Sequence, residues 1–207
     1  MASAVIHLCV AKKVNEKLKM DEKMIALGSI APDISKQIGQ TKVVSHFLDG
    51  QNEDEIPNID RFVKKYRNEL NKPFEMGYLI HLLTDKYWFG DYVYNYISRY
   101  ENKAGVSELT YTGIKNLIYN DYTNLNINLI TKYEPEIDIF MNEITYPESI
   151  ITEIPIEDLP VIVEKMGLII MESKQNKTIV FNMNDIEKFV EECTINVLKD
   201  IEEILSK

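Results

Sequence analysis

The chain has little histidine, cysteine or tryptophan, and its charged residues are mostly acidic. Its 207 residues include 3 histidines, 2 cysteines and 1 tryptophan. Two cysteines make no disulfide framework, and Cys9 and Cys193 fall on apolar faces, so we expect buried, reduced thiols. With 33 acidic and 23 basic residues the net charge is -10, which argues against a nucleic-acid polymer or an anionic lipid surface as the partner.

Long apolar runs are absent as well. No stretch approaches the ~18 residues of a membrane span, so membrane association is not expected. Residues 1–7 lack the basic segment and apolar core of a signal peptide, which predicts a cytoplasmic protein. Apolar residues make up 45% of the chain and charged residues 27%, as in ordinary globular proteins. We expect one domain over residues 1–207, burying roughly 70% of its unfolded surface.

The apolar residues recur at helical spacing almost throughout. Gly, Pro, Asp and Asn break this pattern over 31–57 and predict a long irregular loop, a feature that is often functional. Only residues 178–181 indicate extended backbone. The chain therefore predicts an all-α protein, a single multi-helix domain. Helices are expected over 3–19, 21–30, 58–70, 73–100 (interrupted near Gly90), 112–132, 158–174 and 185–206.

The most informative pair is His81 and Asp85. Their spacing of four residues places an imidazole and a carboxylate on one helix face. The same face is otherwise aromatic, and a carboxylate on a core-facing stripe costs several kcal/mol unless a positive group meets it. A bound metal cluster explains the pair economically. The aromatic residues of that stripe are Phe74, Tyr78, Trp88 and Tyr92.

Three further residues extend this pattern. His7 lies on the apolar stripe of the first expected helix, and Asp33 follows Pro32 at the end of the second. His46 lies in the irregular loop, where binding residues are common. Taken singly, each has a plain structural alternative: a core histidine, a turn residue or a loop residue. Their joint occurrence, with no histidine left over, favours a shared metal site, because imidazole and carboxylate suit zinc and similar ions.

The motifs that carry these residues are Gly-Ser-Ile-Ala-Pro-Asp (28–33), Ser-His-Phe (45–47) and Gly-Tyr-Leu-Ile-His-Leu-Leu-Thr-Asp-Lys-Tyr-Trp (77–88). In this order, after an N-terminal histidine, they resemble the zinc-dependent phospholipase C family of bacteria over roughly residues 4–92. The resemblance implies that family's all-α fold. It implies that one zinc is bound by Asp33, His46, His81 and Asp85. It also implies that His7 binds a second zinc, that Asp85 bridges the two ions and that Asp33 is the general base.

The chain departs from the family pattern in three ways. In the secreted phospholipases a terminal tryptophan completes one zinc site, whereas Met1 or Ala2 stands at that end here. The C-terminal lipid-binding β-sandwich of the clostridial toxins has no counterpart. The family's third zinc uses two more histidines, and no histidine follows Asp85. Residues that could replace them are Asp91, Asn95 and Glu101.

Such a site would support hydrolysis of a phosphate ester. With one or two zinc ions per chain, a metal-bound hydroxide would attack phosphorus while Asp33 takes the proton. We expect a small soluble phosphate ester as the substrate rather than bilayer phospholipid. The residues expected to shape the substrate pocket are Tyr78, Tyr87, Trp88 and Tyr92.

Two other classes bear on this hypothesis. The scaffold also resembles the trinuclear zinc nucleases, so a nucleotide substrate is a variant of it. The HD-domain phosphohydrolases need an adjacent His-Asp pair, which no histidine of this chain forms. The alternative from a different class is a non-catalytic, metal-stabilised binding or accessory protein, and the missing third site favours it.

Overall fold

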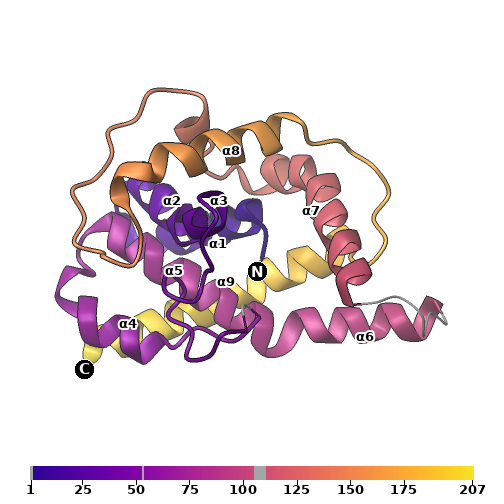
Figure 1. The fold of residues 1–207 in the computed structure, drawn as a ribbon, viewed down its shortest axis with the longest axis horizontal. Helices are drawn as coiled ribbons and strands as arrows, with labels where there is room; N and C mark the ends of the chain where they lie inside the picture. The colour runs from indigo at the N-terminus through magenta and orange to yellow at the C-terminus, as the bar shows by residue number, and fades with distance from the viewer. Residues whose placement is uncertain (1, 53, 105–110) are drawn as a thin grey trace.

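The computed structural model describes residues 2–52, 54–104 and 111–207. Within these ranges every regular element is helical, and no strand is present, which confirms the all-α class (Figure 1). The α-helices are α1 (Ala4–Leu18), α2 (Glu22–Ile30), α3 (Ile34–Gln37), α4 (Ile59–Tyr66), α5 (Pro73–Tyr87), α6 (Val93–Ala104), α7 (Tyr111–Tyr133), α8 (Leu159–Met171) and α9 (Met183–Ser206).

The helices begin where side chains satisfy their first backbone N–H groups. Ser3 accepts from the N–H of Ile6 at the start of α1, and Asp21 caps α2 in the same way. Asn182 and Asp185 form a reciprocal capping box at the start of α9. These local signals explain why the predicted helix ends lie within a few residues of the observed ones.

The most extensive helix–helix contact among the described residues is the crossing of α2 and α5. A Cβ atom on Gly28 would lie 2.1 Å from the carbonyl oxygen of Phe74, and one on Gly77 would lie 2.4 Å from that of Ile25. Only glycine permits so close an approach of two helix backbones. The crossing lies one turn before His81 and directly before Ser29, so it positions part of the candidate site.

The long helix expected over 73–100 is interrupted where the sequence predicts. Between α5 and α6 the residues Trp88–Tyr92 form a π-helical turn that contains Gly90. Such turns realign the side chains that follow and are frequent near functional sites. Figure 1 shows α6 extending away from the centrally placed α5.

Two expectations outside the long helices need correction. The segment 31–57 is not irregular from its start, because Ala31–Asp33 form a 3-10 turn and α3 follows; Pro32 is tolerated there because it lies in the first turn. The segment 178–181 pairs with no strand. Its N–H groups at 179, 180 and 181 instead donate to the carboxylate of Asp121 on α7.

The described helices share one hydrophobic core. Both cysteines are free and buried within it, as expected, and burial raises the pKa of each thiol. Among the described residues, no helix has both the length and the apolarity needed to cross a bilayer.

Candidate metal centre

Five side chains from four parts of the chain meet in the core. The three histidines and Asp85 are fully buried, and Asp33 is 5% exposed. The rings of His7 and His81 stack with their centroids 3.8 Å apart, as the shared metal site expected from the sequence requires. The contributing elements are α1 for His7, the 3-10 turn for Asp33, the following loop for His46, and α5 for His81 and Asp85.

Asp85 lies between the histidines, and its two oxygens face different rings. Oδ1 is 3.4 Å from Nε2 of His7, while Oδ2 is 3.6 Å from Nε2 of His46 and 3.9 Å from that of His81. Asp33 approaches the second group of rings, with Oδ1 3.3 Å from Nε2 of His46 and 4.0 Å from that of His81. This arrangement lets one carboxylate serve two neighbouring ions.

Hydrogen bonds to the outer ring nitrogens define the tautomers. Nδ1 of His81 lies 2.7 Å from the carbonyl oxygen of Ser29, which only accepts, so Nδ1 carries the proton. Nδ1 of His46 lies 2.9 Å from Oγ of Ser45, whose own proton goes to the carbonyl oxygen of Lys42. Oγ therefore accepts from His46. In both rings Nε2 is left with a lone pair directed into the cluster, as in metal-ligating histidines.

The two Nε2 atoms are 3.1 Å apart, and two facing lone pairs repel unless a cation lies between them. A shared proton is one possible cation, but burial opposes it. Burial, assisted by the neighbouring imidazole of His7, lowers the pKa of His81 to about 3, and burial also lowers that of His46. Two nitrogens on a tetrahedral zinc at ~2.0–2.1 Å would be about 3.3 Å apart. A metal ion fits this observed spacing.

Four buried atoms of the cluster have no hydrogen-bond partner among the described residues: Nδ1 and Nε2 of His7, Oδ1 of Asp33 and Oδ2 of Asp85. Two overlapping groups bring their ligand atoms within 4.8 Å of one another: His7, Asp33 and His81, and His46, His81 and Asp85. Nitrogen and oxygen donors of this kind suit zinc and similar divalent ions. The residues present therefore fit a metal centre.

Asp85 also accepts a hydrogen bond from the backbone N–H of Ala2, at 3.1 Å from Oδ1. Burial acts to raise the pKa of its carboxyl group. The close approach of the His7 imidazole, with Nε2 3.4 Å from Oδ1, and nearby positive charges outweigh that effect and hold the pKa well below its usual range. Asp85 is thus ionised at neutral pH, the form that binds a metal.

Sequence reasoning missed Lys42. Its side chain is 1% exposed, and Nζ lies 4.7 Å from the centre of the Phe89 ring. It is close enough to the cluster for its charge to lower the pKa of both His46 and Asp85. The sequence feature that could have indicated its burial is its position next to two valines, four residues before His46. An ammonium beside the cluster favours an anionic ligand there.

A cavity of about 320 Å³ borders the cluster at Asp33. It lies between the N-terminal end of α1, α3, α7 and α8, and Asp33 is the only one of the five candidate ligands that lines it. Asn126 of α7 also lines it and was not singled out from the sequence, because one asparagine on a helix carries no motif. The cavity gives a small molecule access to Asp33.

Three of the four aromatic residues expected to shape the substrate pocket contact other parts of the protein. Tyr78 is fully buried, donates its hydroxyl to the carbonyl oxygen of Ser45 and stacks on Phe62 at 5.4 Å. The structure places the hydroxyl of Tyr87 2.8 Å from Asp200 of α9, and the ring of Tyr92 edge-on to Phe189 of α9. None of the three lines the cavity at Asp33.

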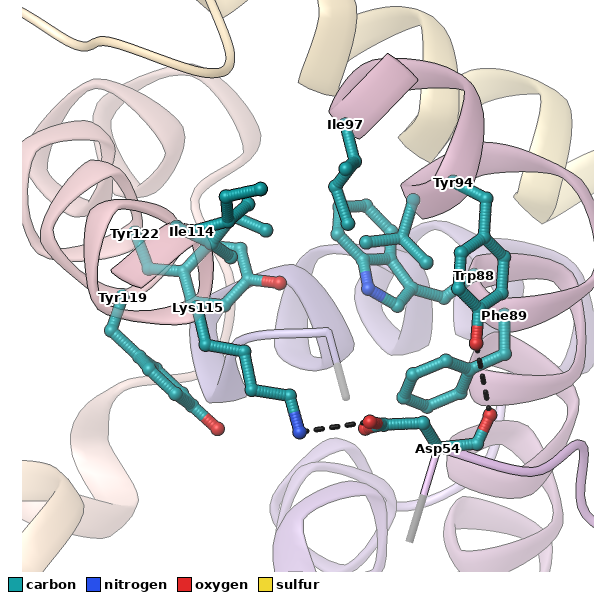
Figure 2. A pocket seen from close by; sticks show the side chains of 11 residues that line it. Asp54, Trp88, Phe89, Tyr94, Ile97, Ile114, Lys115, Tyr119 and Tyr122 are labelled. Carbon is teal, nitrogen blue, oxygen red and sulfur yellow. Dashed lines mark hydrogen bonds and ion pairs between the residues drawn. The ribbon is translucent and has the colours of Figure 1, made fainter. Parts of the chain in front are cut away.

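Trp88 does line a cavity, but a different and smaller one of about 30 Å³ (Figure 2). There the Asp54 carboxylate pairs with Lys115 at 2.8 Å, across from Trp88. None of the five candidate ligands lines this second cavity. Tyr122 of α7 lines both cavities and lies between them.

In comparisons with known proteins, the chain matches no family model, no curated protein and no solved structure. The fold and the site define its class: an all-α protein with a buried histidine–aspartate cluster that could hold a divalent metal. Any assignment of function therefore depends on the geometry of the chain itself.

Proposed function

We propose that the protein is a metal-dependent phosphoester hydrolase with one or two divalent ions, zinc first among them. The ions would be held by His7, Asp33, His46, His81 and Asp85. The observation that carries this proposal is the buried cluster with a facing pair of Nε2 lone pairs, bordered by an accessible cavity.

The buried charges support an anionic substrate. The cluster holds two carboxylates, those of Asp33 and Asp85, and Lys42 lies beside it. Each divalent ion bound there would shift the net charge of the cluster toward positive. A phosphoryl group would restore neutrality in a region where water cannot screen the charge. The net negative charge of the whole chain does not oppose anion binding at the cluster, because the charges close to the bound anion dominate its electrostatic energy.

Asp33 is the residue placed to move a proton. It is the candidate ligand that borders the cavity, and its carboxyl pKa is lowered. Burial opposes that shift, but the imidazoles of His46 and His81, whose Nε2 atoms lie 3.3 and 4.0 Å from Oδ1, outweigh it. A carboxylate oxygen of Asp33 would accept the proton of the attacking water. A bound divalent ion supplies Lewis acidity toward the phosphoryl oxygens and lowers the pKa of water.

A second candidate function is a non-catalytic protein that the metal stabilises. The observation that favours it is the closure of the cluster: all three histidines and Asp85 are 0% exposed. Structural zinc sites are closed in this manner, whereas catalytic sites keep an open position. Asp33, at 5% exposure, is the one point of access.

The two functions are separated by turnover of para-nitrophenyl phosphate and its bis-ester by zinc-loaded protein. Hydrolysis should stop with a chelator, return with zinc, and fall at least ~100-fold in Asp33→Asn. Asp121→Asn is the matched control, because Asp121 is also a buried carboxylate but lies outside the cluster and is bonded to three backbone N–H groups. Metal binding without any turnover would favour the accessory protein.

A further inference from the structure

The cavity at Asp33 is lined by more than the cluster. Its walls are chiefly apolar, with Val5 from α1, Tyr122 from α7 and Ile169 from α8 among them. Lys36 of α3 brings a positive charge to the same wall, one helical turn after Asp33. One end of the cavity thus carries the charged groups, and the remainder suits apolar groups.

One residue of that wall, Asn126, has a buried hydrogen-bond acceptor without a partner among the described residues. Asn126 is 3% exposed, and its Nδ2 donates to Oγ of Ser173 at 3.0 Å. Oγ of Ser173 in turn donates to the carbonyl oxygen of Ile169 at 2.9 Å, which fixes the orientation of the amide. Oδ1 of Asn126 has no hydrogen-bond partner among the described residues. Such a group costs about 1–3 kcal/mol unless a ligand or water satisfies it.

We propose that this cavity is the substrate pocket and that it selects phosphate esters whose organic group is small, apolar and carries an O–H or N–H donor. The phosphoryl group lies at Asp33, the apolar part contacts Val5 and Ile169, and the donor bonds to Oδ1 of Asn126. This inference rests on the proposed function and names its substrate class.

The size of the cavity sets the limit on that group. A volume of about 320 Å³ lies at the lower end of the ~300–1,000 Å³ found for small-molecule pockets. It accommodates one small organic group and excludes a pair of long acyl chains. The pocket therefore favours a soluble ester over a bilayer lipid.

Alkylphosphonates test this without turnover, because their carbon–phosphorus bond is not hydrolysed. Binding of methyl-, propyl- and hexylphosphonate to zinc-loaded protein is measured by calorimetry. The affinity should rise roughly three- to fourfold for each added methylene until the cavity is full. A terminal hydroxyl of matching length should add a further gain, and Asn126→Leu should abolish that gain alone.

The apolar wall has a matched pair of variants on α8. Ile169 lines the cavity and is 42% exposed, whereas its neighbour Leu168 is 51% exposed and does not line it. Ile169→Asn should reduce hexylphosphonate affinity at least fivefold and leave methylphosphonate affinity unchanged. Leu168→Asn should change neither. Because both side chains are partly exposed, neither substitution removes a core residue.

The outcomes distinguish this inference from the proposed function. Metal-dependent binding of methylphosphonate with no gain from a longer chain would overturn the pocket and leave the metal centre in place. Chain-length dependence that persists with a chelator would overturn the phosphoesterase and the ester assignment with it. A chain-length gain that requires the metal and is lost in Ile169→Asn supports both.

Discussion

Nε2 of His46 and Nε2 of His81 lie 3.1 Å apart in the core, each with its lone pair toward the other. Ser45 and the carbonyl oxygen of Ser29 hold the rings in this orientation from behind. The arrangement is costly without a cation, so metal binding and folding stability are coupled. The predictions below follow from this coupling and from the packing around it.

Metal content is the first prediction. Dialysed protein should carry one or two divalent ions per chain by elemental analysis, with zinc expected first. Removal by a chelator should lower Tm by about 5–10 °C relative to protein with free zinc at a hundredfold excess over Kd. Protein that is metal-free and cannot be loaded would mean that the histidines are core residues and not metal ligands.

His81→Ala should lose metal and stability together, because it removes a ligand and leaves Asp85 buried without a cation. The cost to the metal-free fold should be about 2–5 kcal/mol in urea denaturation, since truncating a fully buried ring leaves a cavity. His7→Ala should retain one ion, since four ligands remain. Equal metal content in wild type and His81→Ala would show that the ion binds elsewhere.

The stability of the metal-free protein should depend on pH in a defined window. The pKa of His81 in the folded state, about 3, lies below its ordinary value of ~6.5, and that of His46 is shifted in the same direction. The unfolded chain therefore binds more protons between these values. Stability should be complete above pH ~6.5 and fall as the pH drops toward 3, by up to ~1.4 kcal/mol per unit for each histidine.

The lowered pKa values of Asp33 and Asp85 extend the loss of folding stability to still lower pH. Their contribution is present above the ordinary value of ~3.9 and disappears as the pH falls further. Urea midpoints at pH 7.5, 6, 5 and 4 measure the effect. A midpoint that does not change from 7.5 to 5 would contradict the neutral state assigned to the histidines.

Gly77→Ala should destabilise the fold by about 3 kcal/mol and weaken metal binding. The new methyl group would meet the carbonyl oxygen of Ile25 at 2.4 Å and force α2 away from α5, one turn before His81. Gly90→Ala is the control, because its nearest heavy atom beyond its own neighbours in the chain is 3.9 Å away, on Ile56. Equal urea midpoints for the two variants would show that the crossing tolerates a side chain.

Lys42→Met should weaken the binding of inorganic phosphate to zinc-loaded protein about tenfold, since a buried ammonium is replaced by an apolar group of similar length. Zinc affinity should stay the same or increase, because a positive charge beside the ion is removed. Lys17→Met, at an exposed position on α1, is the control for overall charge. Unchanged phosphate affinity in Lys42→Met would remove Lys42 from anion binding.

The sequence by itself determined the helices and the identity of the cluster. The spacing of His81 and Asp85 is a local property of one helix, and the helix ends follow from caps such as Ser3 and Asn182. With three histidines in the chain, few combinations of ligands were possible. These features need no knowledge of which helix lies against which.

Only the tertiary structure decided what surrounds the cluster. Helical periodicity shows that Tyr78 and Tyr87 face inward or sideways, but not that the first meets Phe62 and the second Asp200. The same holds for Lys42 and Asn126, whose burial depends on segments distant in sequence. The tautomer of His81 likewise depends on a partner outside its own helix, the carbonyl oxygen of Ser29. A periodic pattern identifies the face of a helix that is buried, whereas the partner of that face is set by packing between elements.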